Sequence, residues 1–424
     1  MENTVVIGAQ WGDEGKAKIT DLLSENADLI VRFQGGCNAG HTVVYDDKTY
    51  KFHLVPSGIL YKNKTCFLGN GVVIHPETFE KEINELKLQE VNLSGLRISP
   101  LAVLTMPYHI DIDGLSENSL KNSKIGTTKK GIGPTYSDKI ARIALKVQDL
   151  FDEETLAQRL DSILPLKNSV LKNVYNSKTY EKKEILGFCE RYKNILKPYV
   201  CFEWQNLVRE FKNKKILFEG AQGVMLDVDW GTYPYVTSSN AVSGYAACGS
   251  GFSVSQIKDV IGVYKAYVTR VGEGPFVTEL FDKDGETIQQ IGCEFGTTTG
   301  RKRRTGWFDA VCGKYTALVG GVTKIALTKL DVFDNFEKIK IAVAYKDKRN
   351  GKIYTDFPTN TFIHQYLEPV YEVCDGWMTK TSDIKNYSDL PENAKKYISR
   401  IETLLEVPVS IVSVGADRNQ TIFV

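Results

Sequence analysis

Apolar residues along the chain fall into short runs that alternate with longer stretches of helical periodicity. The runs lie at 4–9, 28–33, 215–220, 259–268, 324–330, 339–345 and 408–414. Several are continuous rather than alternating, which is typical of strands buried on both faces of a parallel sheet. The predicted helices lie at 16–24, 77–88, 153–172, 179–194, 308–319 and 391–405. This order predicts an α/β fold with a large, mostly parallel central sheet flanked by helices.

The segment 151–214 is the most helical and lysine-rich part of the chain. We expect it to form a helical subdomain that packs against the sheet. Length alone would allow two or three domains. No repeat, low-complexity tract or Pro/Ser-rich linker divides the sequence. We therefore predict a single domain over 1–424, with 151–214 as a subdomain within it.

Composition narrows the classes of partner. The formal net charge is +1, so nothing global favours nucleic acid or a membrane surface. No apolar run approaches the length of a membrane span, and the N-terminus has no signal-peptide pattern. Eight cysteines occur without a C-x-x-C pair, and five histidines lie without metal-ligand spacing. We expect a cytoplasmic protein with reduced thiols and no structural zinc.

The stretch GAQWGDEGKAK at 8–18 lies between the first apolar run and the first predicted helix. It differs from the P-loop pattern, because six residues separate its outer glycines and Ala17 follows Lys16 in place of a hydroxyl. Backbone N–H groups at a helix start favour phosphate, so we expect a P-loop-like nucleotide-binding fold. Asp13 could bind Mg²⁺ or accept a proton from the group being phosphorylated. An ordinary tight turn, with Asp13 as a helix cap, is the structural alternative.

A second glycine-rich turn, QGGCNAGHT at 34–42, also follows an apolar run. It offers Asn38 and His41. A lone histidine is usually structural. In a glycine-rich loop beside a phosphate site, His41 is instead expected to donate to developing phosphoryl charge.

The tetrapeptide TKLD at 328–331 resembles the N-K-x-D guanine reader of GTPases, with threonine in place of asparagine. The Asp331 carboxylate can accept from guanine N1–H and the 2-amino group, neither of which adenine offers. The stem of Lys329 can cover the base. Together with the phosphate loop, this motif favours GTP over ATP.

Further polar, glycine-rich stretches occur at 125–136, 218–223, 233–240 and 297–307. The last, TTTGRKRRTGW, is the densest basic run. Arginine guanidinium groups next to threonine hydroxyls can bind small carboxylates or phosphates through paired hydrogen bonds. A nucleic-acid patch is the alternative, and salt-dependent DNA binding would test it. Near-neutral net charge argues against that alternative.

Taken in order, GAQWGDEGK, GGCNAGHT, IGTTKKGIGP, FEGAQG, GTYPYVTSSN, TRVGEGPF, TTTGRKRRTGW, TKLD and VGADR resemble the adenylosuccinate synthetase family over essentially the whole chain. The resemblance implies a ligase that joins IMP and L-aspartate, using GTP and Mg²⁺ and releasing GDP and phosphate. This is the first committed step of AMP synthesis from IMP. It also implies one large, mostly parallel sheet and a homodimer.

The resemblance assigns catalytic roles. Asp13 takes the proton from N1 of IMP so that O6 attacks the γ-phosphoryl group, which gives 6-phosphoryl-IMP. His41 stabilises the transferring group, and Lys16 and Gln222 act beside them. Aspartate then displaces phosphate from C6. Asp13 and the Gly40 carbonyl bind Mg²⁺.

The resemblance also assigns the ligand contacts. For GTP they are Gly12, Asp13, Glu14, Gly15, Lys16, Ala17, Lys18, Gly40, His41, Thr42, Arg303, Lys329, Leu330, Asp331, Ser413, Val414 and Gly415. For IMP they are Asp13, Lys16, Asn38, Ala39, Gly40, His41, Thr128, Arg142, Gln222, Thr237 and Arg301, with Arg142 supplied by the neighbouring subunit. For aspartate they are Thr297, Thr298, Thr299, Gly300, Arg301, Lys302 and Arg303.

The chain departs from the family pattern at two places. The phosphate loop normally ends Gly-Lys-Gly-Lys, whereas Ala17 stands here in place of glycine. We expect this methyl group to raise the KM for GTP modestly. Ser243 and Tyr245 replace small residues and could adjust the nucleotide pocket.

Two further alternatives remain at this point. One is a GTP-binding regulatory switch, which would need no amino-acid ligand. The Asp13 and His41 pair and the basic loop at 297–307 argue against it. The other is a paralogous ligase for another purine nucleotide such as dGMP. We expect that branch to have a small residue at the position of Asp13, so Asp13 favours IMP.

Overall fold

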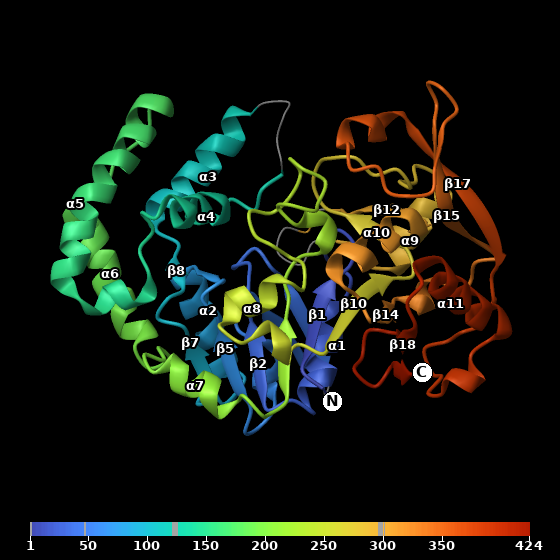
Figure 1. Cartoon of the computed structure of the whole chain (residues 1–424), viewed down its shortest axis with the longest axis horizontal. Coiled ribbons are helices and arrows are strands. Elements are labelled where there is room, and N and C mark those ends of the chain that lie inside the picture. Colours follow the sequence, from blue (N-terminus) through green and yellow to red (C-terminus); the bar gives the residue numbers. More distant parts are fainter. Residues whose placement is uncertain (1, 46–47, 121–125, 296–299, 301) are drawn as a thin grey trace.

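The computed structural model describes residues 2–45, 48–120, 126–295, 300 and 302–424. A nine-stranded sheet runs through the middle of the molecule, and helices surround it (Figure 1). Its strands are ordered β19-β18-β14-β10-β1-β9-β2-β5-β7, and all neighbours are parallel except β18 and β19. The predicted α/β fold with a large, mostly parallel sheet is confirmed.

The strands of this sheet are short. They are β1 (Thr4–Gly8), β2 (Leu29–Arg32), β5 (Thr65–Leu68), β7 (Leu96–Ile98), β9 (Ile216–Glu219), β10 (Asp259–Lys265), β14 (Lys324–Thr328), β18 (Val409–Ser413) and β19 (Thr421–Phe423). Alternate residues of β1 enter different hydrophobic clusters, with Val6 in one and Val5 and Ile7 in the other. Both faces of the sheet are therefore buried, which explains why its strands read as continuous apolar runs.

The helices predicted from periodicity are present within a few residues of their expected bounds. They are α1 (Lys16–Ser24), α2 (Pro76–Leu88), α5 (Glu153–Ser169), α6 (Lys182–Leu196), α10 (Ala310–Gly320) and α11 (Glu392–Leu405). The helices not predicted are α3 (Pro107–Ser119), α4 (Ile132–Ala141), α7 (Trp204–Glu210), α8 (Tyr245–Ser250) and α9 (Lys283–Ile291). In the part of the chain that the structure describes, no helix is both long and apolar enough to cross a membrane.

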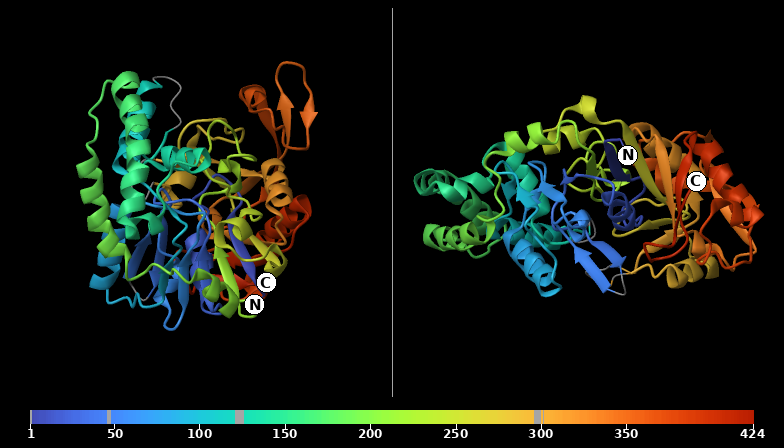
Figure 2. Two further views of the ribbon diagram at one scale, coloured as in Figure 1. Left: turned by 60° about the vertical axis from the view of Figure 1, so that its left-hand side comes forward. Right: turned by 90° about the horizontal axis from the view of Figure 1, so that it is seen from below.

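Helices α5 and α6 stand at one end of the molecule (Figures 1 and 2). Leu156, Leu160 and Ile185 on these helices belong to the same hydrophobic cluster as Val6 and Ile30 of the central sheet. Helices α5 and α6 thus share a hydrophobic core with the central sheet.

The apolar run at 339–345 lies outside the central sheet. It forms part of β15 (Lys338–Asp347), which pairs with β13 (Phe308–Asp309), β16 (Ile353–Tyr354) and β17 (Leu367–Asp375) at the opposite end from α5. At its start, exposed Lys338 and partly exposed Lys340 alternate with buried Ile339 and Ile341. This alternation is typical of a strand with only one buried face.

The remaining strands are two-stranded pairs around the sheet. They are β3 (His41–Tyr45) with β4 (Lys48–Phe52), β6 (Val73–Ile74) with β8 (Val103–Leu104), and β11 (Val268–Arg270) with β12 (Arg304–Gly306). Two of these pairs carry predicted site residues. His41 begins β3, and Arg303 immediately precedes β12.

Candidate active site

A cavity of about 790 Å³ lies where the loops after β1, β2 and β9 meet. Ligand sites of open α/β sheets form at this edge, beyond the carboxyl ends of the strands. The predicted site residues that line it are Gly12, Asp13, Gly15, Lys16, Ala17, Asn38, Ala39, Gly40, His41, Thr42, Thr128, Gln222, Thr237 and Arg303. Most of the motifs singled out in the sequence therefore contribute to one cavity.

The phosphate loop turns into α1 at Gly15, whose φ of 84° suits glycine. No side chain of the described residues caps this helix, so its first N–H groups remain available to an anion. Lys16 lies against the buried Glu14, with Nζ 2.7 Å from Oε2. Glu14 also accepts hydrogen bonds from the N–H groups of Gln10 at 3.0 Å and Gly12 at 2.8 Å. The buried carboxylate of Glu14 thus holds the phosphate loop in place through these contacts.

Asp13 sits in the loop with a positive φ of 61° and is about one-third exposed. Its Oδ2 accepts a hydrogen bond from Nε of Arg303 at 2.8 Å. Arg303 is separated from Asp13 by 290 positions in the sequence. Asp13 does not cap α1, so the alternative interpretation of this acid as a helix cap is wrong.

His41 is held by a buried carboxylate. Its Nδ1 lies 2.6 Å from Oε1 of Glu219, and Glu219 also accepts from the N–H and hydroxyl of Ser57 at 3.1 and 3.2 Å. Burial alone would raise the pKa of Glu219, but the hydrogen bond to His41 and its charge lower it overall. A carboxylate only accepts, so Nδ1 of His41 carries a proton. Burial lowers the pKa of His41 against the opposing effect of Glu219.

Glu219 was not predicted as a site residue. It ends the strand β9, whose four residues are all buried, and Arg32 ends the equally buried β2 with Nη1 3.8 Å from Oε1 of Glu219. A charge at the end of an apolar strand must find a partner when it is buried. The charge of Glu219 and of Arg32 at the end of an apolar run was therefore the sequence feature that could have identified these two residues.

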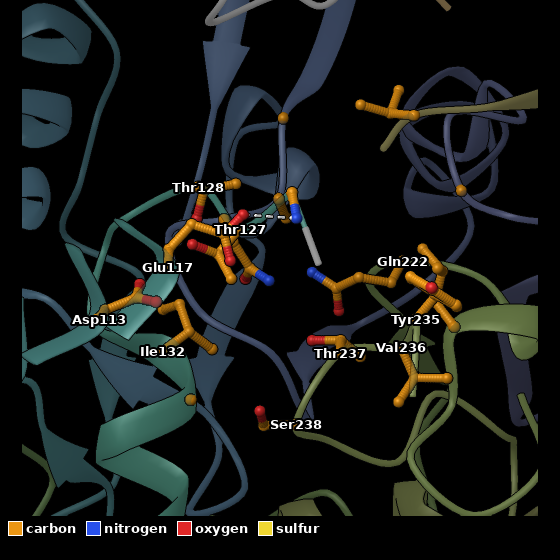
Figure 3. Close-up of a pocket in the computed structure, with 18 of the residues that line it drawn as sticks. Asp113, Glu117, Thr127, Thr128, Ile132, Gln222, Tyr235, Val236, Thr237 and Ser238 are labelled. Atoms are coloured by element: carbon orange, nitrogen blue, oxygen red, sulfur yellow. Dashed lines mark hydrogen bonds between the residues drawn. The ribbon is translucent and has the colours of Figure 1, made fainter. Parts of the chain in front are cut away.

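Gln222 has a positive φ of 56° and a buried side-chain amide. Neither its oxygen nor its nitrogen has a hydrogen-bond partner in the described part of the chain. Figure 3 shows Gln222 beside Tyr235, Val236, Thr237 and Ser238 on one side of the pocket. A buried amide without partners at a cavity wall is suited to a ligand that presents both a donor and an acceptor.

Across the pocket, α3 holds the glycine-rich stretch that contains Thr128 (Figure 3). Oδ2 of Asp113 accepts from the Gly131 N–H at 2.9 Å, and Oε1 of Glu117 accepts from the Gly126 N–H at 2.7 Å. Both carboxylates are nearly buried and lie one helical turn apart. They hold Gly126 and Gly131 on either side of Thr128, a role that the sequence did not indicate.

The predicted guanine-binding residues lie outside the lining of the large cavity. Lys18 contacts two of them, since its Nζ donates to Ser413 Oγ at 2.7 Å and to the carbonyls of Gly415 and Gln420 at 2.8 and 2.9 Å. Burial lowers the pKa of Lys18 to about 7. Oδ1 of Asp331 is buried with no hydrogen-bond partner among the described residues, and burial raises the pKa of this carboxyl.

The other predicted guanine-binding residues also follow strands of the central sheet. Lys329 and Leu330 come after β14, and Val414 comes after β18. Leu330 and Val414 are fully buried, and Nζ of Lys329 donates to the Gly292 carbonyl at 2.7 Å. The Thr328 hydroxyl donates to the Glu14 carbonyl at 2.6 Å. This contact joins the end of β14 to the phosphate loop.

Among the predicted residues that the structure describes, Gly300, Lys302 and Arg142 do not line the cavity. Thr297, Thr298, Thr299 and Arg301 lie outside the described residues. Gly300 and Lys302 are exposed, and Lys302 forms a β-bridge with Phe295. Arg142 is the C-cap residue that follows α4, and it is exposed.

Among the described residues, no group of three or more His, Cys, Asp or Glu side chains is arranged to hold a metal ion. Asp13 and Gly40 both line the cavity. Mg²⁺ is usually bound by one or two protein carboxylates together with substrate phosphates and water. The oxygen donors of Asp13 and Gly40 therefore fit Mg²⁺ that arrives with a nucleotide.

Comparison with known proteins agrees over the whole chain. A family model described as adenylosuccinate synthetase matches residues 5–422. The chain is 49% identical over 425 residues to the adenylosuccinate synthetase of Brevibacillus brevis and 51% identical over 429 residues to that of Brachyspira hyodysenteriae. Each match covers 100% of this chain and 99% of the relative.

Solved structures give the same result. The fully ligated adenylosuccinate synthetase of Plasmodium falciparum is 40% identical, with a TM-score of 0.93 and complete coverage of both chains. A cyanophage S-2L succinoaminodeoxyadenylate synthetase bound to dGMP is 18% identical, with a TM-score of 0.60 over 100% of this chain and 95% of that one, and shares the fold alone. Over its full length, the chain therefore belongs to the adenylosuccinate synthetase family.

Proposed function

We propose that this chain joins IMP to L-aspartate in two steps, through 6-phosphoryl-IMP formed in the cavity described above. Adenylosuccinate synthetase activity follows from the full-length family match. The roles of individual residues are our proposal. The observation that carries it is the meeting of Asp13, His41 and Gln222 in one cavity, from the segments that follow β1, β2 and β9.

In the first step, Asp13 accepts the N1 proton of IMP, and O6 attacks the γ-phosphorus of GTP. The O6–P bond forms, the bond from phosphorus to the bridging oxygen breaks, and GDP leaves. His41 donates to the transferring phosphoryl group, and Lys16 and the backbone around it hold the phosphates. Stabilisation of this charge by fixed donors is the main protein contribution to phosphoryl transfer.

In the second step, the amine of aspartate attacks C6. The C6–N bond forms, the C6–O6 bond breaks and phosphate leaves with the former O6, taking up the proton that the amine loses. The oxo group of IMP is a poor leaving group, which explains why GTP is used first. Gln222 and Thr237, together with Asn38, hold the base and phosphate of IMP. The unpartnered amide of Gln222 supports this assignment.

The remaining ligand contacts are proposed as the family resemblance assigns them. Lys329 and Asp331 read guanine beside Ser413 and Gly415. Arg303 and the residues at 297–302 receive aspartate. Asp13 and Gly40 would hold Mg²⁺, which neutralises phosphate charge when it is bound.

We further propose a cytoplasmic homodimer in which 1–424 is one domain and 151–214 its helical subdomain. Arg142 would reach the IMP phosphate of the partner. Its exposure at the end of α4, close to Ile140 with 78% exposure, supports an interface at this surface.

The proposal is tested with purified protein supplied with IMP, GTP, L-aspartate and Mg²⁺, each omitted in turn, while adenylosuccinate is followed by its absorbance and by chromatography. We expect product only with the complete set. GTP turnover without a succinylated product, or product only when dGMP replaces IMP, would contradict it.

Replacing Asp331 by asparagine should lower kcat/KM for GTP by about 10²-fold, because the amide leaves one guanine donor unpaired in a buried site. Xanthosine triphosphate carries a carbonyl in place of the 2-amino group, so it should become the better substrate. Kinetics with both nucleotides check this. Asp383→Asn, which removes an exposed pair with Lys380, is the control. An Asp331→Asn variant that still prefers GTP would contradict guanine reading by Asp331.

Replacing Ala17 by glycine should lower the KM for GTP about twofold to threefold and leave kcat unchanged. Ala17 is the second residue of α1 and lines the cavity, so we propose that its methyl group limits how closely a phosphate approaches the backbone there. Glycine in the helix should cost about 0.5–1 kcal/mol of stability. GTP kinetics and thermal unfolding measure both effects. Unchanged GTP kinetics would show that the methyl group is neutral.

Arg142→Leu and Asp13→Asn homodimers should each be nearly inactive, but a mixture should recover activity. In a mixed dimer, the Asp13→Asn subunit supplies Arg142 to the only site with an intact Asp13. Equal mixing of exchanging subunits should restore about a quarter of the unmodified activity, since half of the dimers are mixed and each has one working site. Absence of recovery, with subunit exchange shown by mass spectrometry, would mean that Arg142 does not act across the interface.

A further inference from the structure

A buried ionic cluster lies behind Asp13. Glu294 and Lys265 are both fully buried, and Nζ of Lys265 lies 2.7 Å from Oε1 of Glu294. The same oxygen accepts from the Tyr267 hydroxyl at 2.6 Å. The other oxygen, Oε2, accepts from Nη1 of Arg303 at 2.7 Å. Both oxygens of Glu294 are therefore occupied by donors.

Arg303 connects this cluster to the catalytic loop. One edge of its guanidinium reaches Glu294, while Nε donates to Asp13 at 2.8 Å. Asp13 and Arg303 line the cavity, and Glu294 is not among the described lining residues. Arg303 is therefore the residue that hydrogen-bonds to both Glu294 and Asp13.

The backbone ties the same two residues together. The Arg303 N–H donates to the Glu294 carbonyl at 2.9 Å, and Phe295 forms a bridge with Lys302. Glu294 and Arg303 thus flank, on paired backbone, the stretch that we propose to receive aspartate. A carboxylate at this position can affect both the base and the amino-acid site.

Charge keeps Glu294 ionised. Burial alone would raise its pKa, but Lys265, Lys329 and Arg303 surround it and lower the pKa to about 2. Arg303 is itself only 11% exposed. A planar guanidinium clamped at one edge by a fixed carboxylate has little freedom at its other edge.

We propose that Glu294 is a positioning residue for both half-reactions: it fixes Arg303, and Arg303 orients the Asp13 carboxylate toward its substrate. This inference rests on the proposed function. It explains why a fully buried acid accepts from Lys265 and Arg303 at once, although Lys265 alone would satisfy one charge. The competing explanation is that Glu294 only neutralises buried Lys265.

Glu294→Gln separates these explanations, because an amide has one accepting edge and one donating edge. With its carbonyl toward Lys265 and Tyr267, its NH₂ group faces Arg303 and releases it. The first readout is scrambling of ¹⁸O from the β,γ-bridge of GTP in the presence of IMP and Mg²⁺ without aspartate. This readout follows reversible phosphoryl transfer alone. The second readout is kcat/KM for aspartate in the full reaction.

We expect the scrambling rate to fall about tenfold and kcat/KM for aspartate about 10²-fold, since displacement of a catalytic group by about 1 Å has effects of this size. Glu372→Gln, which breaks the Arg400–Glu372 pair away from the cavity, is the matched control and should change neither readout. The Glu294→Gln substitution is also measured in a chain that already carries Arg303→Met. If Glu294 acts through Arg303, adding Glu294→Gln to Arg303→Met should cause no further kinetic loss.

The result that overturns the inference is a lower melting temperature with both kinetic readouts unchanged, which leaves Glu294 as a counter-ion for Lys265. A change in aspartate kinetics alone, or additive losses in the double variant, would also overturn it. If Glu294→Gln does not fold, Glu294→Asp keeps the charge for Lys265 but is too short to span both partners, and it should show the same two losses. An unmodified chain that forms no adenylosuccinate and shows no IMP-dependent scrambling would instead contradict the proposed function.

Discussion

An Asp13→Asn variant should form adenylosuccinate about 10³-fold more slowly than the unmodified chain, because asparagine cannot accept the N1 proton of IMP. General-base catalysis accounts for roughly 10²–10⁴-fold in comparable steps. The amide also weakens the contact with Arg303, which now donates to the carboxylate at 2.8 Å. The measurement is kcat at saturating IMP, GTP and aspartate, with product separated by chromatography.

Asp161→Asn is the matched control. Asp161 is mostly exposed on α5 and pairs with Lys182, so its replacement should leave kcat unchanged. GTP binding by the Asp13→Asn variant should remain measurable, since the backbone of the phosphate loop is intact. A kcat within tenfold of the unmodified chain would show that another group takes the N1 proton.

A His41→Asn variant should lose about 10²–10³-fold in kcat, the usual effect of removing one donor that faces developing negative charge. Glu219 accepts from Nδ1, so donation from the other ring nitrogen requires the doubly protonated ring. Activity that depends on this form should fall as pH rises through the pKa of His41 in the substrate complex. The measurement is the pH profile of kcat, and the variant should lack this decline.

His364→Asn is the control for His41. His364 is also buried, but its Nε2 lies 2.6 Å from the Pro358 carbonyl and it is not among the described residues that line the cavity. Its replacement should affect stability more than kcat. An unchanged kcat in the His41→Asn variant, or the same pH decline in both proteins, would exclude His41 as the donor.

The parts of the molecule that sequence predicted best are those determined by local pattern. Continuous apolar runs became strands such as β1 because both of its faces are covered. The phosphate loop was predictable because a strand, a glycine turn and a helix start follow one another directly at Gly15. The TKLD motif likewise indicated Asp331, which follows β14 and whose Oδ1 has no hydrogen-bond partner among the described residues.

Contacts between distant segments were not predictable in the same way. Nothing local to Asp13 indicates Arg303, which reaches it from 290 positions away. Glu219 ends the apolar strand β9 and Glu294 follows α9, and the roles of their charges are evident only once His41 and Lys265 pack against them. The strand β15 was assigned by its apolar content, whereas the alternation of Lys338, Ile339, Lys340 and Ile341 indicated a separate sheet.

The most direct test of the two-step account uses IMP labelled with ¹⁸O at C6, with GTP, Mg²⁺ and aspartate. If O6 attacks the γ-phosphoryl group and later leaves with it, the label must appear in the released phosphate, one atom for each adenylosuccinate formed. Mass spectrometry of the phosphate measures this. Unlabelled phosphate with the label released to water would mean that GTP is hydrolysed separately and that no 6-phosphoryl-IMP lies on the path.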